Sequence, residues 1–186
     1  MKSMNQDLLP IVAVLALAAL ATGCQSSAPQ RASGPGSAVA VQVAAALRAD
    51  LDSAPATVER HGAAVTLTVP AAWAFELDQA PVHERFAPQL ARIAATLNRF
   101  SQSLVEVTGH TDSFGLRELN RSFSAERAAA VCAALVGAGV AADRCVSRGE
   151  GENGPIADNA TADGRRRNRR VEIRVTPLPA SGRAAS

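Results

Sequence analysis

Helical and strand periodicities alternate along the middle of this sequence, and that alternation limits the chain to a few architectures. Five large apolar residues recur four, three, four and three positions apart: Phe86, Leu90, Ile93, Leu97 and Phe100. This spacing predicts a helix over residues 84–99 with one buried face. Leu104, Val105 and Val107 follow soon after and predict a strand. A one-sided helix next to apolar strands favours a sheet that is covered by helices.

The other elements are predicted from the same two periodicities. Val65, Leu67 and Val69 alternate with threonines, which is typical of a half-buried strand, and the residues before them complete a hairpin that turns at His61-Gly62. Further elements are expected as helices over 39–51 and 124–136, strands at 145–151 and 170–175, a loop at 73–81, and a loop with one helical turn at 151–164. We therefore expect an α/β sandwich of the α+β class.

The first residues are typical of an exported protein. Lys2 precedes an apolar run of 14 residues that ends before Thr22, Gly23 and Cys24. A membrane-spanning helix needs about 20 residues, so this run fits the apolar part of a cleaved signal peptide better. The ending Ala21-Thr22-Gly23-Cys24 resembles a bacterial lipobox, although Ala21 stands where leucine is usual. It predicts a signal peptide over 1–23 and lipidation of Cys24, with an ordinary cleaved signal or an uncleaved anchor helix as the alternatives.

A segment rich in Ser, Pro, Gly and Gln follows Cys24. It has no periodicity, so residues 24–37 are expected to form the lipidated cysteine and a flexible tether. Gln25, rather than an aspartate, after the cysteine favours the outer membrane over the inner membrane. Residues 38–62 are expected to add an N-terminal helix and an edge strand, and residues 177–186 to form a disordered tail.

The stretch from Gly109 to Arg127 combines an acid and a base around the predicted end of a strand. Asp112 lies in the loop after that strand, at the sheet edge where ligands bind in α/β proteins. With Ser124 as the N-cap of the next helix, Arg127 falls in the first helical turn, where free backbone N–H groups and the helix dipole also attract anions. The pair predicts a site for a ligand that carries one ammonium and one carboxylate on the same carbon, as a free amino acid does.

Four sequence blocks, GHTDSFG, LNRSFSAERA, GEGENGPIADN and GRRRNRRVEI, resemble the OmpA-like peptidoglycan-binding domain in order and spacing. The resemblance covers about residues 65–175 and implies a domain over 63–176. It implies the connectivity β-α-β-α-β-β, with one mixed sheet covered by helices. The helix and strand before residue 63 would then be additions to the family fold.

The resemblance also implies a function. The family binds the diaminopimelate residue of the peptidoglycan stem peptide, and no bond is made or broken, so we expect no enzyme activity and no cofactor. By position, Asp112 would hold the ligand's ammonium and Arg127 its carboxylate. Five further residues are implied around them: Thr111, Leu119, Asn120, Asn168 and Arg169. We therefore expect an outer-membrane lipoprotein whose domain faces the periplasm and binds the peptidoglycan of the cell wall. The alternative is a scaffold subunit of an envelope machine, such as a secretion system, with other envelope proteins as partners.

Other functions are disfavoured by the residues themselves. His110 and Asp112 have no further His or Cys beside them, and two ligands do not make a zinc site. The serines near His110 lack a nucleophile elbow, which disfavours catalysis. The arginines of 165–170 are not interleaved with aromatic residues, and the export signal also argues against nucleic acid. Cys132 and Cys145 are expected either to form a disulfide or to pack as two buried thiols.

Overall fold

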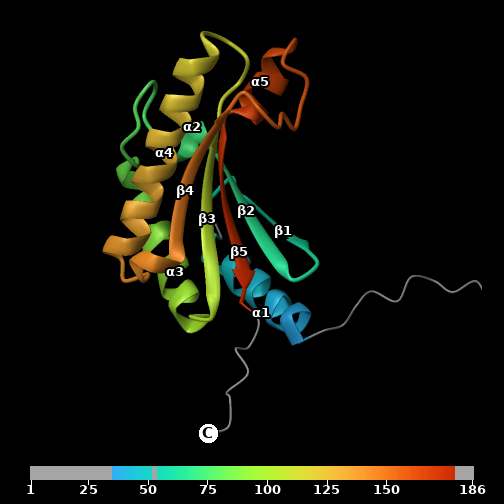
Figure 1. Ribbon diagram of the computed structural model, residues 1–186, viewed down its shortest axis with the longest axis vertical. Coiled ribbons are helices and arrows are strands. Elements are labelled where there is room, and N and C mark those ends of the chain that lie inside the picture. The colour runs from blue at the N-terminus through green and yellow to red at the C-terminus, as the bar shows by residue number, and fades with distance from the viewer. Residues whose placement is uncertain (1–34, 52–53, 179–186) are drawn as a thin grey trace, which may run out of the picture. The chain divides into compact units, whose positions relative to one another are not determined.

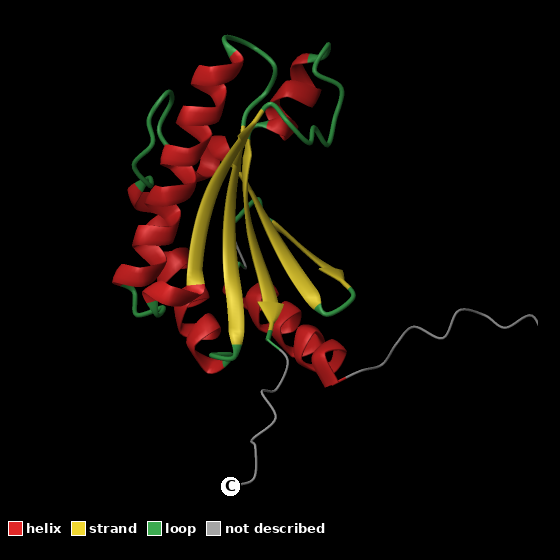
Figure 2. Cartoon of the chain, in the orientation of Figure 1, coloured by secondary structure: helices red, strands yellow, loops and turns green. Residues whose placement is uncertain are grey.

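The computed structural model describes residues 35–51 and 54–178, so the predicted signal peptide, Cys24, most of the tether and the end of the tail lie outside the described residues. The described chain forms one five-stranded sheet with helices on one face (Figure 1, Figure 2). The strands are β1 (Thr57–His61), β2 (Ala64–Pro70), β3 (Ser103–His110), β4 (Cys145–Gly151) and β5 (Arg170–Pro177). The helices are α1 (Pro35–Asp50), α2 (Ala71–Ala74), α3 (Ala87–Arg99), α4 (Arg117–Gly137) and α5 (Ala162–Asn168), with short 3-10 turns at Glu84–Phe86 and Ala142–Arg144. None of these helices is long and apolar enough to cross a membrane.

The sheet is mixed, as expected. Its order is β1-β2-β5-β3-β4, with β5 antiparallel to both β2 and β3, and with β3 parallel to β4. The hairpin of β1 and β2 forms one edge, and α4 makes the crossover from β3 to β4. The prediction of an α+β sandwich with an extra N-terminal helix and strand is therefore confirmed.

The core lies between the sheet and the helices α1, α3 and α4. Leu67, Ile173 and Val107 are paired across three neighbouring strands, so their side chains form one row on the same face. All three are fully buried, as are Phe86 and Ile93 of the predicted helical stripe. The alternation that predicted the strands is thus the alternation between the covered face and the open face of the sheet.

Helix α4 begins earlier than predicted and corrects the interpretation of two residues. The chain leaves a turn at Gly115, whose φ of 96° suits glycine, and becomes helical at Arg117 rather than at Ser124. Ser124 is therefore not an N-cap; its hydroxyl donates to Arg121 O and accepts from Gly151 N, both at 2.9 Å. Arg127 lies near the middle of the helix, so the predicted contribution of free N–H groups and the helix dipole is wrong.

Two glycines let α4 lie directly on the sheet. A Cβ atom on Gly109 of β3 would stand 2.1 Å from the carbonyl oxygen of Ser124, and one on Gly149 of β4 would stand 2.4 Å from that of Arg121. No side chain fits into these gaps, because ordinary Cβ contacts are longer than 3 Å. The ends of β3 and β4 are therefore held against the middle of α4, next to Asp112.

Three smaller differences concern segments without a clear pattern. The loop expected at 73–81 overlaps α2, and the loop expected at 151–164 runs into α5, which takes in the arginines at 165–167. Helix α1 begins at Pro35, inside the residues predicted as tether.

Of the two arrangements expected for Cys132 of α4 and Cys145 of β4, the structure has the disulfide. Their Cα atoms lie 6.0 Å apart.

Candidate functional site

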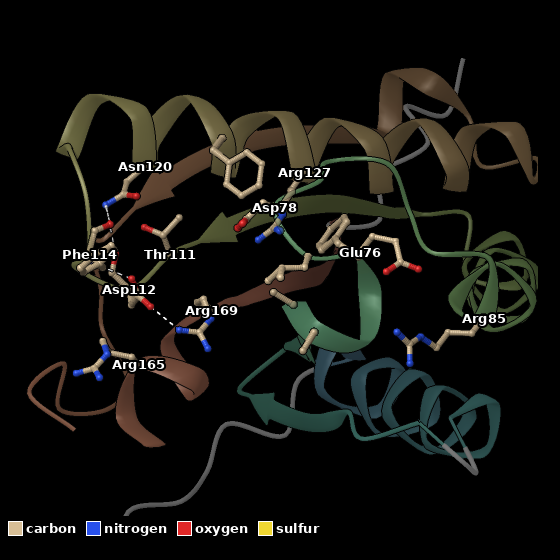
Figure 3. A pocket seen from close by; sticks show the side chains of 15 residues that line it. Glu76, Asp78, Arg85, Thr111, Asp112, Phe114, Asn120, Arg127, Arg165 and Arg169 are labelled. Carbon is tan, nitrogen blue, oxygen red and sulfur yellow. Dashed lines mark hydrogen bonds and ion pairs between the residues drawn. The ribbon is translucent and has the colours of Figure 1, made fainter. Parts of the chain in front are cut away.

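A pocket of about 640 Å³ lies at the end of the sheet where β3 leads into α4. Four segments build it: the β3–α4 loop, the first half of α4, the segment that follows β2, and the end of α5 (Figure 3). Its lining residues are Ala71, Ala72, Phe75, Glu76, Leu77, Asp78, Arg85, Thr111, Asp112, Phe114, Asn120, Phe123, Arg127, Arg165 and Arg169. We call this the main pocket.

Asp112 is a buried carboxylate whose two oxygens have different partners. Oδ1 accepts a hydrogen bond from the backbone N–H of Phe114 at 3.0 Å, and Oδ2 forms an ion pair with Arg169. The amide of Asn120 donates to the carbonyl oxygens of Asp112 and Phe114 at 3.3 and 3.2 Å. The carboxylate is thus held in place, and a ligand ammonium would reach Oδ2 by sharing or displacing Arg169 (Figure 3).

Arg127 is a buried cation between two aromatic rings. Its guanidinium carbon lies 4.1 Å from the ring centre of Phe123 and 4.9 Å from that of Phe75. Within the described chain, its one hydrogen bond runs from Nε to Gln79 O at 2.9 Å, and no carboxylate lies at ion-pair distance. Burial lowers the pKa of Arg127 below its ordinary value, against the opposing effect of Asp78. A desolvated guanidinium with free Nη groups is suited to a carboxylate ligand.

Of the seven residues that the resemblance implied, five line the main pocket together: Thr111, Asp112, Asn120, Arg127 and Arg169. The hydroxyl of Thr111 is buried and has no hydrogen-bond partner in the part of the chain that the structure describes, which suits it to a ligand hydrogen bond. Leu119 does not line this pocket. It is 63% exposed and lines a shallow depression beside the main pocket, formed by Asp78, Gly115, Leu116, Leu119, Asn120, Ser122, Phe123 and Glu126. We call that depression the acidic hollow.

Asn168 is also absent from the pocket wall, and its contacts show a positioning role. It is fully buried, and its Oδ1 accepts from the N–H groups of Ile156 and Ala157 at 2.9 Å each. Its Nδ2 donates to Asn159 Oδ1 at 2.8 Å, and that same oxygen accepts from the N–H of Ser113 at 3.3 Å. Asn168 therefore ties the loop after β4 to the residue that follows Asp112.

The segment after α2 is a part of the site that was not predicted from the sequence. Phe75, Glu76, Leu77 and Asp78 form one wall of the main pocket, and Gln79 accepts the hydrogen bond from Arg127. Asp78 has a positive φ of 54°, which an aspartate tolerates better than most residues. The only local signal was the pair of acidic residues in an otherwise apolar segment, and it indicated nothing about its distant neighbours.

His110 helps to shape the loop through a contact with the residues after β4. Its Nδ1 lies 3.1 Å from Asn153 O. Its Nε2 is buried without a hydrogen-bond partner among the described residues, 3.9 Å from a carboxylate oxygen of Glu172. In the described chain, no group of His, Cys, Asp and Glu side chains could hold a metal ion. We assign His110 to the structure of the loop and not to a metal site.

The protonation of His110 should make the folded state sensitive to acid. Burial, with a smaller effect of Arg170, lowers the pKa of His110 below its ordinary value of 6.5. The stabilisation from the neutral ring is present above that value and is lost as the pH falls below it, because the unfolded chain takes up the proton first. We expect His110→Asn, which keeps a donor for Asn153, to show a shallower loss of unfolding free energy between about pH 7 and about pH 5. Urea titrations would measure it; parallel pH profiles for both proteins would contradict this role.

Comparison with known protein families matches residues 74–169 of this chain to the OmpA family. The chain belongs to the OmpA family. The match covers α3, β3, α4, β4, α5 and the lining of the main pocket except Ala71 and Ala72, and it leaves out α1, β1, β2 and β5. The resemblance indicated by the four sequence blocks is thereby confirmed.

Curated relatives of this OmpA-family chain match it over about half of its length. The probable lipoprotein YiaD of Escherichia coli is 44% identical over 92 residues, which are 50% of this chain and 42% of YiaD. The peptidoglycan-binding protein ArfA of Mycobacterium tuberculosis is 44% identical over 86 residues, which are 46% of this chain and 26% of ArfA. The chain thus spans less than half the length of either relative.

Solved structures extend the likeness beyond the matched segment. The cell wall anchor of the T6SS from Pseudomonas aeruginosa is 34% identical, with a TM-score of 0.65, over 73% of this chain and 96% of that one. A putative MotB-like protein from Desulfovibrio vulgaris has a TM-score of 0.69 at 22% identity, over 79% of this chain and 96% of that one, and shows the shared fold alone. The likeness in fold therefore extends beyond residues 74–169.

Proposed function

We propose that this OmpA-family protein binds peptidoglycan without covalent chemistry, through the diaminopimelate of the stem peptide. Asp112 holds the ligand's ammonium and Arg127 holds its carboxylate. The observation that carries the proposal is the pairing, in one pocket, of a buried carboxylate with a buried guanidinium that has no carboxylate at ion-pair distance among residues 35–51 and 54–178. Such a pair is complementary to a zwitterion.

Two of the relatives support the ligand. ArfA is named a peptidoglycan-binding protein, and the structure from Pseudomonas aeruginosa is described as a cell wall anchor. Thr111 and Asn120 would complete the contacts to the ligand from the same loop and helix, and Arg169 would form the wall between the ligand and α5.

The proposal extends to the part of the chain before α1. A signal peptide over 1–23, a lipid on Cys24 and a tether up to α1 would place the domain in the periplasm, attached to the outer membrane. The protein would then link that membrane to the cell wall. The lipoprotein YiaD supports this architecture by its name.

A second candidate function has one observation in its favour. The likeness to a secretion-system anchor, at 34% identity, also fits a subunit of an envelope machine that uses this domain to anchor its partners. In this second candidate the domain serves mainly as a partner or anchor module and wall binding is secondary or lost, so the assay that follows separates the two candidates.

Co-sedimentation of the full-length protein with purified sacculi tests the proposal. We expect the protein to pellet with sacculi and to be released by free meso-diaminopimelate. Pimelate has the two carboxylates without the ammonium groups, and cadaverine has the ammonium groups without the carboxylates, so neither should release it. Equal release by all three compounds, or no pelleting, would overturn the proposed ligand.

A further inference from the structure

A second pocket, of about 480 Å³, lies beside the main pocket. Ala72 and Arg169 line both, so the two pockets share a wall. The other lining residues are Pro55, Thr57, Thr68, Pro70, Trp73, Ile156, Arg166, Arg167 and Arg170. We call this the arginine pocket. Its far wall comes from residues 55–70, which lie outside the segment matched to the family, 74–169.

The arginine pocket combines an apolar lining with positive charge. Pro55, Pro70, Trp73 and Ile156 supply apolar surface, and four of the lining residues are arginines, whereas none is acidic. Arg170 is a structural part of this wall: it is buried, and its guanidinium donates to Glu172 at 2.7 Å and to Gly154 O at 3.0 Å. The charge that a ligand can reach therefore belongs to the other three arginines.

The positive charges of Arg166 and Arg167 are only partly neutralised by their neighbours. Their side chains are 64% and 61% exposed, and both form ion pairs with the same carboxylate, that of Asp163. One carboxylate cannot neutralise two guanidinium groups, so this trio carries a net positive charge. Exposed ion pairs of this kind are weak, and a ligand carboxylate can compete with Asp163 for either arginine.

The charges of the two pockets next to the main pocket favour one orientation of its ligand. The acidic hollow adjoins it at Asp78, Asn120 and Phe123, and its charged lining residues are Asp78 and Glu126. The arginine pocket adjoins it at Ala72 and Arg169, and Arg169 forms an ion pair with Asp112. A ligand ammonium that takes the place of Arg169 at Asp112 would release that guanidinium toward the arginine pocket. A second carboxylate of the ligand is therefore favoured on the arginine side and disfavoured on the acidic side.

We propose that the arginine pocket is a second subsite for the same peptide, which takes a small apolar residue with a free carboxylate that follows diaminopimelate. The apolar lining contacts the side chain, and Arg166 and Arg167 hold the carboxylate. The inference rests on the proposed function, because diaminopimelate in the main pocket brings the next residue of the peptide to the shared wall.

Two synthetic peptides separate the subsites. The tripeptide L-Ala-γ-D-Glu-meso-diaminopimelate fills the main pocket alone, and the tetrapeptide adds D-alanine with a free carboxylate. For the full-length protein in isothermal titration calorimetry, we expect about tenfold tighter binding of the tetrapeptide than of the tripeptide or of the tetrapeptide amide. Equal affinities for the three peptides would overturn the second subsite and leave the proposed function intact. Absence of binding to all three would overturn both.

Variants assign the preference to these arginines. Arg166→Gln with Arg167→Gln should remove the preference for the tetrapeptide and leave the affinity for the tripeptide unchanged. Asp163→Asn should increase the preference, because it removes the competing carboxylate. Arg148→Gln is the matched control: that arginine is 57% exposed on β4 and lines neither pocket. A preference that survives the double substitution, or that Arg148→Gln reduces equally, would contradict the assignment.

Discussion

Replacing Arg127 with Gln should reduce the affinity for sacculi and for the tripeptide by roughly 100-fold, or about 3 kcal/mol. The guanidinium is buried between Phe75 and Phe123, where water does not replace a lost hydrogen bond. Gln keeps a donor but loses the charge and the fork that match a carboxylate. Calorimetry with the tripeptide, and pelleting with sacculi, would measure the change.

Arg121→Gln is a matched control for this substitution. Arg121 lies on the same helix, is exposed, and does not line the main pocket, so we expect its loss to leave the affinity unchanged. Arg127→Lys adds a test of geometry, because lysine keeps the charge without the planar fork; its affinity should fall between those of the wild type and Arg127→Gln. An Arg127→Gln protein that is folded and pellets as well as the wild type would contradict the site.

Replacing Gly109 with Ala should destabilise the fold by about 3 kcal/mol or more, and should lower the melting temperature by roughly 10 °C. The added Cβ would lie 2.1 Å from the carbonyl oxygen of Ser124, and a backbone atom in the middle of a helix cannot rotate away. Helix α4 must then move off β3, which also moves Arg127 relative to Asp112. Thermal and urea unfolding monitored by circular dichroism would measure the loss.

Gly137→Ala distinguishes this steric effect from a general effect of losing a glycine. Gly137 is the last residue of the same helix, and a Cβ there would meet no atom within 4 Å. Because alanine favours helices over glycine, the substitution should be neutral or slightly stabilising. Equal destabilisation by both substitutions would show that contact with the sheet is not the cause.

The elements that could be predicted from the sequence are those whose pattern is set by one buried face. The alternation at Val65, Leu67 and Val69 and the stripe from Phe86 to Leu97 indicate the face that packs on the core, so periodicity alone locates the strand and the helix. The start of α4 was misplaced because Ser124 has the chemistry of an N-cap, whereas its hydroxyl in fact binds Gly151 of a neighbouring strand. A local propensity cannot reveal such a tertiary contact.

The site likewise contains residues that could be predicted from the sequence and residues that could not. Asp112 and Arg127 lie in one recognisable stretch, and the family pattern indicated both. The wall at Phe75–Asp78 could not be predicted, because its contact with Arg127 joins residues 48 positions apart, and the ion pair of Asp112 with Arg169 joins residues 57 apart. The arginine pocket was also missed, since the arginines of 165–170 showed a basic run without showing that it faces Pro55 and Trp73.

The position of β5 in the sheet has a consequence for how the chain acquires its structure. This strand follows the other four in sequence but lies between β2 and β3 in space. The two halves of the sheet therefore have no direct pairing until β5 has been synthesised and inserted. Such non-local pairing is slow to form. The growing polypeptide consequently remains without a complete core until nearly all of the domain has emerged.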